Sequence, residues 1–306
     1  MKHLKLVLAC VLLFVHGCTD KPESPGSGGN NNAQSMNHDL SLSGSFKGPL
    51  GLQLWSVRDY TKDDVRGTLD KVRSMGFRNV ELAGTYGLSP AEFRSMLAEN
   101  DLTATAMHAP YDRFRDSTDV VVSEAKTLGV EYVGVAWIPH DGDAPLSVET
   151  VQTAAAYFNK WGATARDSGI RFFYHVHGYE FQAGPDGKTA FDLLAALTDP
   201  ELVSFEMDVF WVTLPGVDPS ELLRRYPDRW KLMHIKDMRK GTTLGVHTGS
   251  APAEDDVPIG TGLIDYEEVL RTAAKVGVEQ YYIEDESPQP LQNIPRSVSF
   301  LESIRF

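Results

Sequence analysis

The feature that most constrains this fold is a short pattern that occurs four times along the chain. In each copy a helix-like stretch ends in a glycine, and an apolar residue, one or two polar residues and a β-rich run follow it. The four glycines are Gly76, Gly129, Gly169 and Gly277. A glycine just past a helix end readily adopts the left-handed backbone conformation that stops the helix. The pattern therefore predicts repeated units in which a helix returns to a strand.

Eight β-rich segments can be counted, and helix-compatible stretches separate them. Eight strand–helix units in about 260 residues fit a (β/α)8 barrel. The alternative, an open doubly wound sheet, is expected to have a glycine-rich loop after its first strand, but the segment LQLWSVRDY contains no glycine. We therefore predict an α/β fold, a (β/α)8 TIM barrel, at residues 47–306, with the active site at the C-terminal strand ends. The predicted strands cover roughly residues 51–57, 79–83, 103–108, 131–137, 170–177, 203–209, 231–236 and 281–285.

The first 18 residues have the composition of an export signal. Two lysines precede an apolar run at residues 6–15, which is too short to span a bilayer. The run ends in the sequence VHGC, which resembles the bacterial lipobox, whose cysteine (here Cys18) is lipidated. We predict a signal peptide at residues 1–18, a flexible linker at residues 19–46 and an exported, membrane-anchored lipoprotein facing the periplasm or the cell surface. The alternative is an ordinary signal peptide that is cut nearby.

Composition narrows the classes of function. The chain has 29 Lys and Arg residues against 42 Asp and Glu residues, a formal net charge of -13, and such acidity disfavours binding to nucleic acid. Its two cysteines, Cys10 and Cys18, both lie in the signal segment, so the rest of the chain has no disulfide, thiolate metal site or cysteine nucleophile. We expect contact with a membrane only through the lipid anchor, and the oligomeric state stays open.

Metal-compatible residues stand at the ends of four successive predicted strands. Alternation places His175 and His177 on one face of strand five, and Glu206 and Asp208 on one face of strand six. Because neighbouring strands lie about 5 Å apart, four such side chains can converge on one ion. The predicted metal ligands are His175, Asp208, His234 and Glu284. The alternative is a set of separate ion pairs around the barrel rim.

This ligand set indicates which ions fit. Two nitrogens and two carboxylates without sulfur suit Mn²⁺, Fe²⁺, Co²⁺ or Zn²⁺ better than Ca²⁺, and Mg²⁺ suits them less well. Further residues at the strand ends are candidate substrate contacts, with local hydrogen bonding or ordinary core packing as the alternative. These candidates are Glu81, His108 and His177, together with Trp55, Trp137 and Trp211, whose aromatic faces suit a sugar ring.

Five motifs in order resemble the sugar phosphate isomerase/epimerase family of xylose isomerase-like barrels, from about residue 50 to residue 306. They are LGLQLWSVRD, YHVHGYEF, EMDVFWV, MHIKD and VPIGTGLIDY. The resemblance implies one divalent metal held by strands five to eight, on the four ligands named above. Ketose epimerases of this superfamily use a glutamate on strand five, paired with the glutamate of strand eight for proton transfer. Here strand five has His175, with Glu180 five residues further on.

The first functional hypothesis is a metal-dependent isomerase or epimerase of a sugar or keto-sugar that is not phosphorylated. It would abstract a proton next to a carbonyl through a metal-stabilised enediolate, with Glu284 or Glu180 moving the proton and Lys236 stabilising the oxyanion. A second hypothesis is a lyase or hydratase that acts on 3-keto-glycosides with the same enolising site. A third is a non-catalytic sugar-binding lipoprotein. The long segment 239–256 is expected to fold over the mouth as a lid, with His247 near the substrate.

Overall fold

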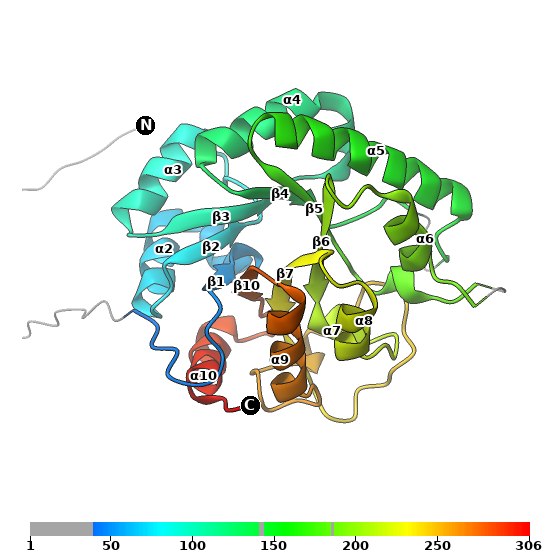
Figure 1. The fold of residues 1–306 in the computed structure, drawn as a ribbon. Coiled ribbons are helices and arrows are strands. Elements are labelled where there is room, and N and C mark those ends of the chain that lie inside the picture. The colour runs from blue at the N-terminus through cyan, green and yellow to red at the C-terminus, as the bar shows by residue number, and fades with distance from the viewer. Residues whose placement is uncertain (1–38, 141–143, 185–186) are drawn as a thin grey trace, which may run out of the picture. The chain divides into compact units, whose positions relative to one another are not determined.

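The computed structural model describes residues 39–140, 144–184 and 187–306. Eight parallel strands form a closed barrel in the order β1-β10-β7-β6-β5-β4-β3-β2 (Figure 1). This confirms the predicted (β/α)8 barrel. A further two-stranded antiparallel sheet pairs β8 (Asp237–Met238) with β9 (Asp256–Val257). The barrel strands are β1 (Leu50–Gln53), β2 (Asn79–Leu82), β3 (Thr103–His108), β4 (Tyr132–Val135), β5 (Arg171–His175), β6 (Val203–Asp208), β7 (Trp230–Ile235) and β10 (Gln280–Ile283).

Amphipathic helices cover the outside of the barrel. The four glycines of the repeated pattern all have positive φ angles, 98° at Gly76, 83° at Gly129, 78° at Gly169 and 85° at Gly277, as the pattern predicts. The main helices are α2 (Val65–Ser74), α3 (Pro90–Glu99), α4 (Tyr111–Leu128), α5 (Val148–Asp167), α6 (Ala190–Leu197), α8 (Pro219–Arg225), α9 (Tyr266–Val276) and α10 (Pro290–Ser303). Shorter helical turns are η1 (Leu54–Val57), α1 (Arg58–Thr61), η2 (Tyr179–Phe181), α7 (Val209–Thr213) and η3 (Ala253–Asp255).

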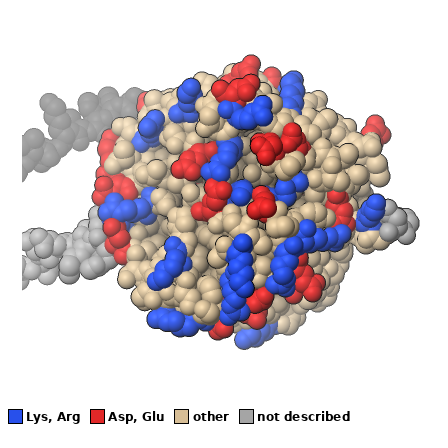
Figure 2. Space-filling view, in the orientation of Figure 1, with Lys and Arg blue, Asp and Glu red and all other residues tan. Residues whose placement is uncertain are grey.

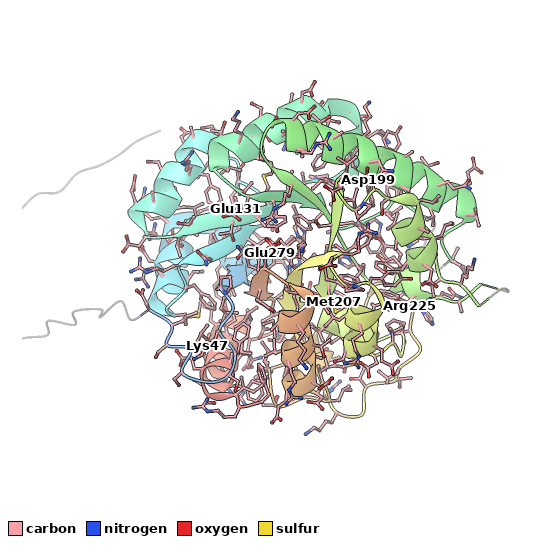
Figure 3. The ribbon with its side chains drawn as sticks, in the orientation of Figure 1. Lys47, Glu131, Asp199, Met207, Arg225 and Glu279 are labelled. Atoms are coloured by element: carbon pink, nitrogen blue, oxygen red, sulfur yellow. The ribbon has the colours of Figure 1, made fainter. Side chains whose placement is uncertain are left out.

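The barrel interior is filled by a buried apolar layer and closed below it by ion pairs. The layer consists of Ala106, Tyr132, Phe173, Leu232 and Tyr282. At the N-terminal end of the strands, Arg171 contacts Glu279 at 2.8 Å and Glu131 at 3.7 Å (Figure 3 labels both glutamates). These ion pairs lie at the opposite end of the barrel from Asp208, the last residue of β6.

The first strand is shorter than the predicted 51–57. It ends at Gln53, whose side chain accepts the N–H of Trp55 and starts the 3-10 turn η1. Trp55 is consequently 46% exposed instead of packed in the barrel.

The described end of the predicted linker packs on the barrel. Asp39 lies 2.8 Å from both Arg73 and Arg78, and the ring of Phe46 is buried against Tyr281. The chain thus contacts the barrel before residue 47. The predicted signal peptide, Cys18 and the predicted linker up to residue 38 lie outside the described residues. Within the described part of the chain, no helix is long and apolar enough to cross a membrane. Figure 2 shows acidic and basic side chains interspersed over one face.

Candidate active site

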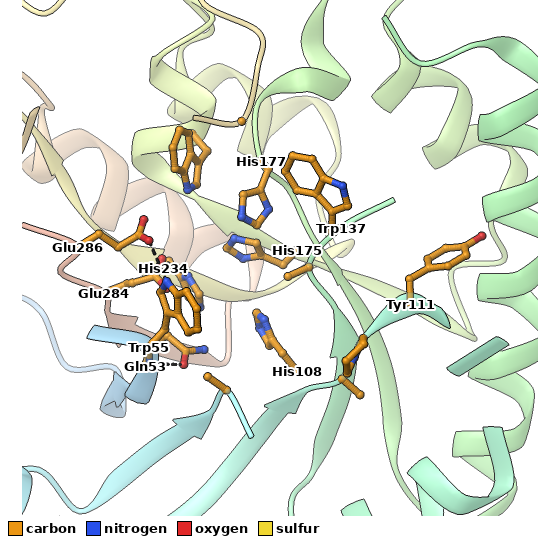
Figure 4. A pocket seen from close by; sticks show the side chains of 16 residues that line it. Gln53, Trp55, His108, Tyr111, Trp137, His175, His177, His234, Glu284 and Glu286 are labelled. Carbon is orange, nitrogen blue, oxygen red and sulfur yellow. Dashed lines mark hydrogen bonds and ion pairs between the residues drawn. The ribbon is translucent and has the colours of Figure 1, made fainter. Parts of the chain in front are cut away.

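The strand register brings the predicted site residues to one level of the barrel interior. Each of four site residues lies two positions after a member of the buried layer, so both point into the barrel. These four are His108, His175, His234 and Glu284. Above them opens a cavity of about 410 Å³ (Figure 4). Its lining consists of Gln53, Trp55, Ala83, His108, Ala109, Pro110, Tyr111, Ala136, Trp137, His175, His177, Trp211, His234, Gly249, Glu284 and Glu286.

Three of the four predicted metal ligands lie together, and we call Asp208, His234 and Glu284 the mouth cluster. His234 Nδ1 lies 3.7 Å from Asp208 Oδ2 and 3.3 Å from Glu284 Oε2. Asp208 Oδ1 accepts the N–H of Trp211 at 2.9 Å, whereas the buried Oδ2 has no hydrogen-bond partner among the described residues. Such spacing, with a buried unpartnered carboxylate oxygen, fits a divalent ion with ligands at about 2.0–2.2 Å.

The fourth predicted ligand, His175, lies beside this cluster rather than in it. Its ring centroid is 4.4 Å from that of His234, and its Nδ1 lies 3.0 Å from Glu206 Oε2. Burial and the neighbouring His234 lower the pKa of His175 well below its ordinary value. A neutral imidazole at this position can still ligate an ion through its other nitrogen.

Beneath the mouth cluster lies a second group, Glu81, His108 and Glu206, which we call the floor cluster. His108 Nε2 contacts Glu81 Oε1 at 3.1 Å and Glu206 Oε2 at 3.0 Å. Although burial opposes its charge, the two carboxylates raise the pKa of His108 to about 10. Burial opposes ionisation of the carboxylates too, but the surrounding histidines lower the pKa of Glu81 and of Glu206 to about 2. The floor cluster is therefore a set of paired charges.

His234 connects the two clusters through its two ring nitrogens. Its Nε2 lies 2.5 Å from Glu81 Oε2 and 3.2 Å from Glu206 Oε1, while Nδ1 faces the mouth cluster. A carboxylate that accepts Nε2–H fixes the tautomer and directs the other nitrogen toward a metal. The structure therefore places Glu81, a predicted substrate contact, under His234 and outside the cavity lining. Gln53 Nε2 donates to the same carboxylate at 2.7 Å.

Lys236 lies next to the mouth cluster and is buried. Its Nζ pairs with Glu286, lies 3.5 Å from Glu284 Oε2 and lies 5.0 Å from the ring centroid of Trp211. Burial opposes its charge, but the carboxylates hold the pKa of Lys236 above its ordinary value. Lys236 therefore remains a cation beside the mouth cluster, and it lines an adjoining cavity of about 190 Å³ rather than the cavity above His234. Glu286 also accepts the indole N–H of Trp55 at 2.9 Å.

His177 lines the cavity between two of the predicted aromatic residues. Its ring stacks on Trp211, with centroids 5.7 Å apart, and meets Trp137 edge-on at 5.4 Å. Its buried Nδ1 has no hydrogen-bond partner among the described residues. Burial lowers the pKa of His177 to about 3, which keeps the imidazole neutral.

Glu180, a predicted proton shuttle, is not brought together with these residues. It is fully buried, accepts the hydroxyl of Tyr174 at 2.5 Å and the N–H of His177 at 3.0 Å, and does not line the cavity. Burial raises the pKa of Glu180 to about 7, against the lowering effect of the Tyr174 hydrogen bond. Its geometry is that of a residue that holds the loop after β5.

The segment 239–256 reaches the cavity, as expected of a lid. Gly249 has a φ of 65° and lines the cavity, and a Cβ there would lie 2.9 Å from the ring of Trp137. Asp237 holds the following segment, because it accepts the N–H groups of Gly260 and Gly262 at 2.9 and 2.8 Å. His247 is not among the residues that line the cavity.

The sequence does not identify every residue of the site. Gln53 and Glu286 carry no signal beyond their positions at strand ends, and Glu286 follows Glu284 by two residues. Glu206 does carry one, because it shares a strand face with Asp208, yet nothing in the sequence shows that its partners are histidines.

Comparisons with known proteins agree with this geometry. The sequence model of the family described as "Xylose isomerase-like TIM barrel" matches residues 69–304. An inosose dehydratase of Clostridium perfringens strain 13 is 31% identical over 158 residues, which cover 49% of this chain and 52% of that protein. The chain thus aligns with about half the length of that relative. An inosose dehydratase of Clostridium botulinum Eklund 17B is 27% identical over 230 residues, covering 71% of this chain and 73% of that protein.

Two solved structures have the same fold. A sugar phosphate isomerase/epimerase from Parabacteroides distasonis superposes with a TM-score of 0.67 at 22% identity, covering 86% of this chain and 97% of that one. The IolI protein with a bound zinc atom superposes with a TM-score of 0.62 at 15% identity, covering 83% and 95% of the two chains.

Proposed function

Because the chain belongs to the xylose isomerase-like TIM barrel family, we propose that it is a metal-dependent lyase that acts on a keto-sugar or keto-cyclitol. The reaction would remove a proton next to the carbonyl and expel the oxygen substituent on the adjoining carbon. Inosose dehydratases among its relatives support this choice. The isomerase or epimerase reaction is the second candidate, supported by the similar barrel from Parabacteroides distasonis.

The mouth cluster would hold the metal. Its imidazole and carboxylate atoms suit Mn²⁺, Fe²⁺, Co²⁺ or Zn²⁺. Burial opposes protonation of His234, but Glu206, Glu284 and Glu81 raise its pKa well above the ordinary value, and the same negative charge favours a metal cation. The chemistry that such an ion supplies, when bound, is stabilisation of negative charge on the substrate's carbonyl oxygen. Lys236 would contribute a second positive charge beside that oxygen.

The observation that carries the proposal is the contrast between His177 and Glu180. His177 lines the cavity as a neutral imidazole whose buried Nδ1 has no hydrogen-bond partner among the described residues, so we assign it the acceptance of the proton from carbon. The electron pair then forms a carbon–carbon double bond, the carbon–oxygen bond breaks, and His177 returns the proton to the leaving oxygen on the same face. Epimerisation needs a second proton-transfer group on the opposite face. Glu180 lies outside the cavity lining, and Glu284 lines the cavity but belongs to the mouth cluster that would hold the metal.

Incubation in D2O with keto-sugars, keto-glycosides and keto-cyclitols tests the reaction class. An unsaturated or cleaved product, lost in His177→Gln with metal content retained, is the expected result. Glu180→Gln is the matched control, and it should keep most of the activity. Deuterium at the α-carbon without bond cleavage would instead establish the epimerase. Metal and sugar binding without any exchange would leave a sugar-binding protein.

We also propose that the chain is exported and lipid-anchored through Cys18, on the strength of its N-terminal sequence. Labelling of growing cells with a radioactive fatty acid tests this. Incorporation that is lost in Cys18→Ser supports the anchor, and a soluble, unlabelled wild-type protein contradicts it.

A further inference from the structure

The cavity has two ends of different chemistry. The polar end is formed by Gln53, His175, His177, His234, Glu284 and Glu286. The apolar end is formed by Ala109, Pro110, Tyr111, Ala136 and Trp137. The apolar end follows β3 and β4, which lie across the eight-stranded ring from β7 and β10, the strands that lead to His234 and Glu284. His175 ends the neighbouring strand β5 and His177 follows it, and the two ends meet where the rings of His177 and Trp137 have centroids 5.4 Å apart. Figure 4 shows Tyr111 and Trp137 on the far side of the cavity from Glu284 and Glu286.

The apolar end offers little to a sugar hydroxyl. The side chains of Ala109, Pro110 and Ala136 have no hydrogen-bonding group, and the hydroxyl of Tyr111 points away from the other labelled residues (Figure 4). A hydroxyl group that loses water without gaining a partner is strongly disfavoured. A second polyol ring could lay its apolar face on Trp137, but the side chains of Ala109, Pro110 and Ala136 would leave its hydroxyl groups without partners, whereas an apolar group would gain from burial.

The aromatic wall of this end is fixed and accessible. Trp137 is 40% exposed and lines the cavity. It stacks on His140 with centroids 4.9 Å apart, meets Tyr179 at 4.7 Å and backs onto Gly249 of the lid segment. A preordered indole face of this kind suits a flat apolar ring.

We propose that the substrate is a conjugate in which the keto-sugar or keto-cyclitol carries an apolar aromatic substituent, and that the apolar end binds this substituent. The inference rests on the proposed function, since the polar end is taken to bind the ring that reacts. It adds a specificity determinant, with Trp137 and Ala136 as the residues that select the substituent.

Binding of unreactive probes separates the two claims. We would measure calorimetric affinities of full-length, metal-loaded protein for matched pairs of 4-nitrophenyl and methyl β-glycosides of glucose, galactose and xylose. The aryl member of at least one pair should bind about tenfold more tightly or better. Equal affinities within every pair, or no measurable binding of any probe, would overturn the inference.

Two tryptophans of similar exposure provide the matched variants. Trp137→Ala should abolish the aryl preference, whereas Trp55→Ala, at the polar side and 46% exposed, should weaken both members of a pair and keep their ratio. Ala136→Asp is the second variant, and it should reduce the binding of the aryl glycosides alone.

An aryl preference that survives both Trp137→Ala and Ala136→Asp would place the substituent elsewhere. If unsubstituted keto-sugars react well and no aryl preference exists, the proposed function stands and this inference falls. If an aryl preference exists but no substrate is eliminated in D2O, the binding site for the substituent stands and the proposed lyase function falls.

Discussion

The mouth cluster and the floor cluster both place carboxylates around His234, yet at different distances from it. In the floor cluster the contacts of Glu81 and Glu206 with histidine nitrogens lie between 2.5 and 3.2 Å, the range of hydrogen bonds and ion pairs. In the mouth cluster the contacts with His234 are longer, 3.3 and 3.7 Å, and Asp208 keeps one oxygen without a partner. Glu81 Oε1 and Glu206 Oε1 of the floor cluster also have no hydrogen-bond partner among the described residues, but each lies 3.1–3.2 Å from a histidine nitrogen. The two clusters therefore differ in how closely a cationic group approaches their carboxylates.

These different distances indicate different roles for the two clusters. Buried carboxylates need positive partners, and in the floor cluster the histidines supply them, with His108 as a cation. Such a paired group can orient its neighbours without an ion. Among the described residues, the cations beside the two carboxylates of the mouth cluster are Lys236 and His234, and the cluster lies under the cavity. A divalent ion would complete this cluster. His108 and Glu206 of the floor cluster also lie within ligand distance of His175 and His234, but there the histidines already pair with the carboxylates.

Asp208→Asn should have the largest effect, because it removes a metal ligand of the mouth cluster and leaves the floor cluster intact. Asparagine can still accept the N–H of Trp211 and cap α7, so the barrel should fold, but the ligand charge is lost. We expect stoichiometric Mn²⁺ or Zn²⁺ binding to disappear, and activity to fall by about a thousandfold or more. Metal analysis of the purified protein and thermal unfolding test this. One equivalent of metal in both Asp208→Asn and His234→Ala would put the ion somewhere else.

Lys236→Met should give the next largest effect. Removal of one group that stabilises a developing oxyanion is expected to lower kcat about a hundredfold, with metal content unchanged. It also leaves Glu286 without its cation, so the protein should lose stability. The double variant Lys236→Met/Glu286→Gln should recover the stability and not kcat. Recovery of kcat in the double variant would show that Lys236 only balances Glu286.

Glu81→Gln examines the connection between the two clusters. It removes the charge that orients His234 without touching the mouth cluster, so metal should bind about 10–100-fold more weakly but still stoichiometrically. Competition with a chelator of known affinity measures this. Unchanged affinity would mean that Gln53 and Glu206 alone orient His234.

The sequence predicts the barrel and most of the cavity for the same physical reason. In a closed parallel barrel all strands end on one side, and side chains alternate, so His175, His234 and Glu284 must meet once their strands are identified. The number of strands and the glycines that end the helices are local signals, and both are confirmed.

The positions of the remaining site residues depend on how deep each side chain lies in the barrel and on the turns after the strands. Neither can be read from the order of residues along the chain. Glu81 and Glu284 both follow apolar strand residues, but only the structure shows that Glu81 lies under His234. Trp55 leaves the barrel because Gln53 starts a 3-10 turn. Glu180 follows Gly178, whose φ of 94° turns the chain, and its carboxylate meets Tyr174 on the outward face of β5.

Glu180 gives the smallest predicted effect. Unlike the carboxylates of the two clusters, it is buried with no cation among its hydrogen-bond partners. Its pKa rises from an ordinary 4.5 to about 7 in the folded protein. Between these pH values the native state holds a proton that the unfolded chain has released, so stability is full below pH 4.5 and falls as pH rises through 7. The difference in unfolding free energy between wild type and Glu180→Gln should decrease by about 3 kcal/mol across this window. Denaturant unfolding at a series of pH values, with a chelator present throughout so that metal binding does not contribute, measures this difference.

Tyr174→Phe is the second variant. It removes a hydrogen bond that favours the ionised carboxylate, so the pH range over which stability falls should extend above pH 7. A constant difference from pH 4 to 8 would mean that Glu180 is ionised throughout, with a counter-charge like those of the floor cluster.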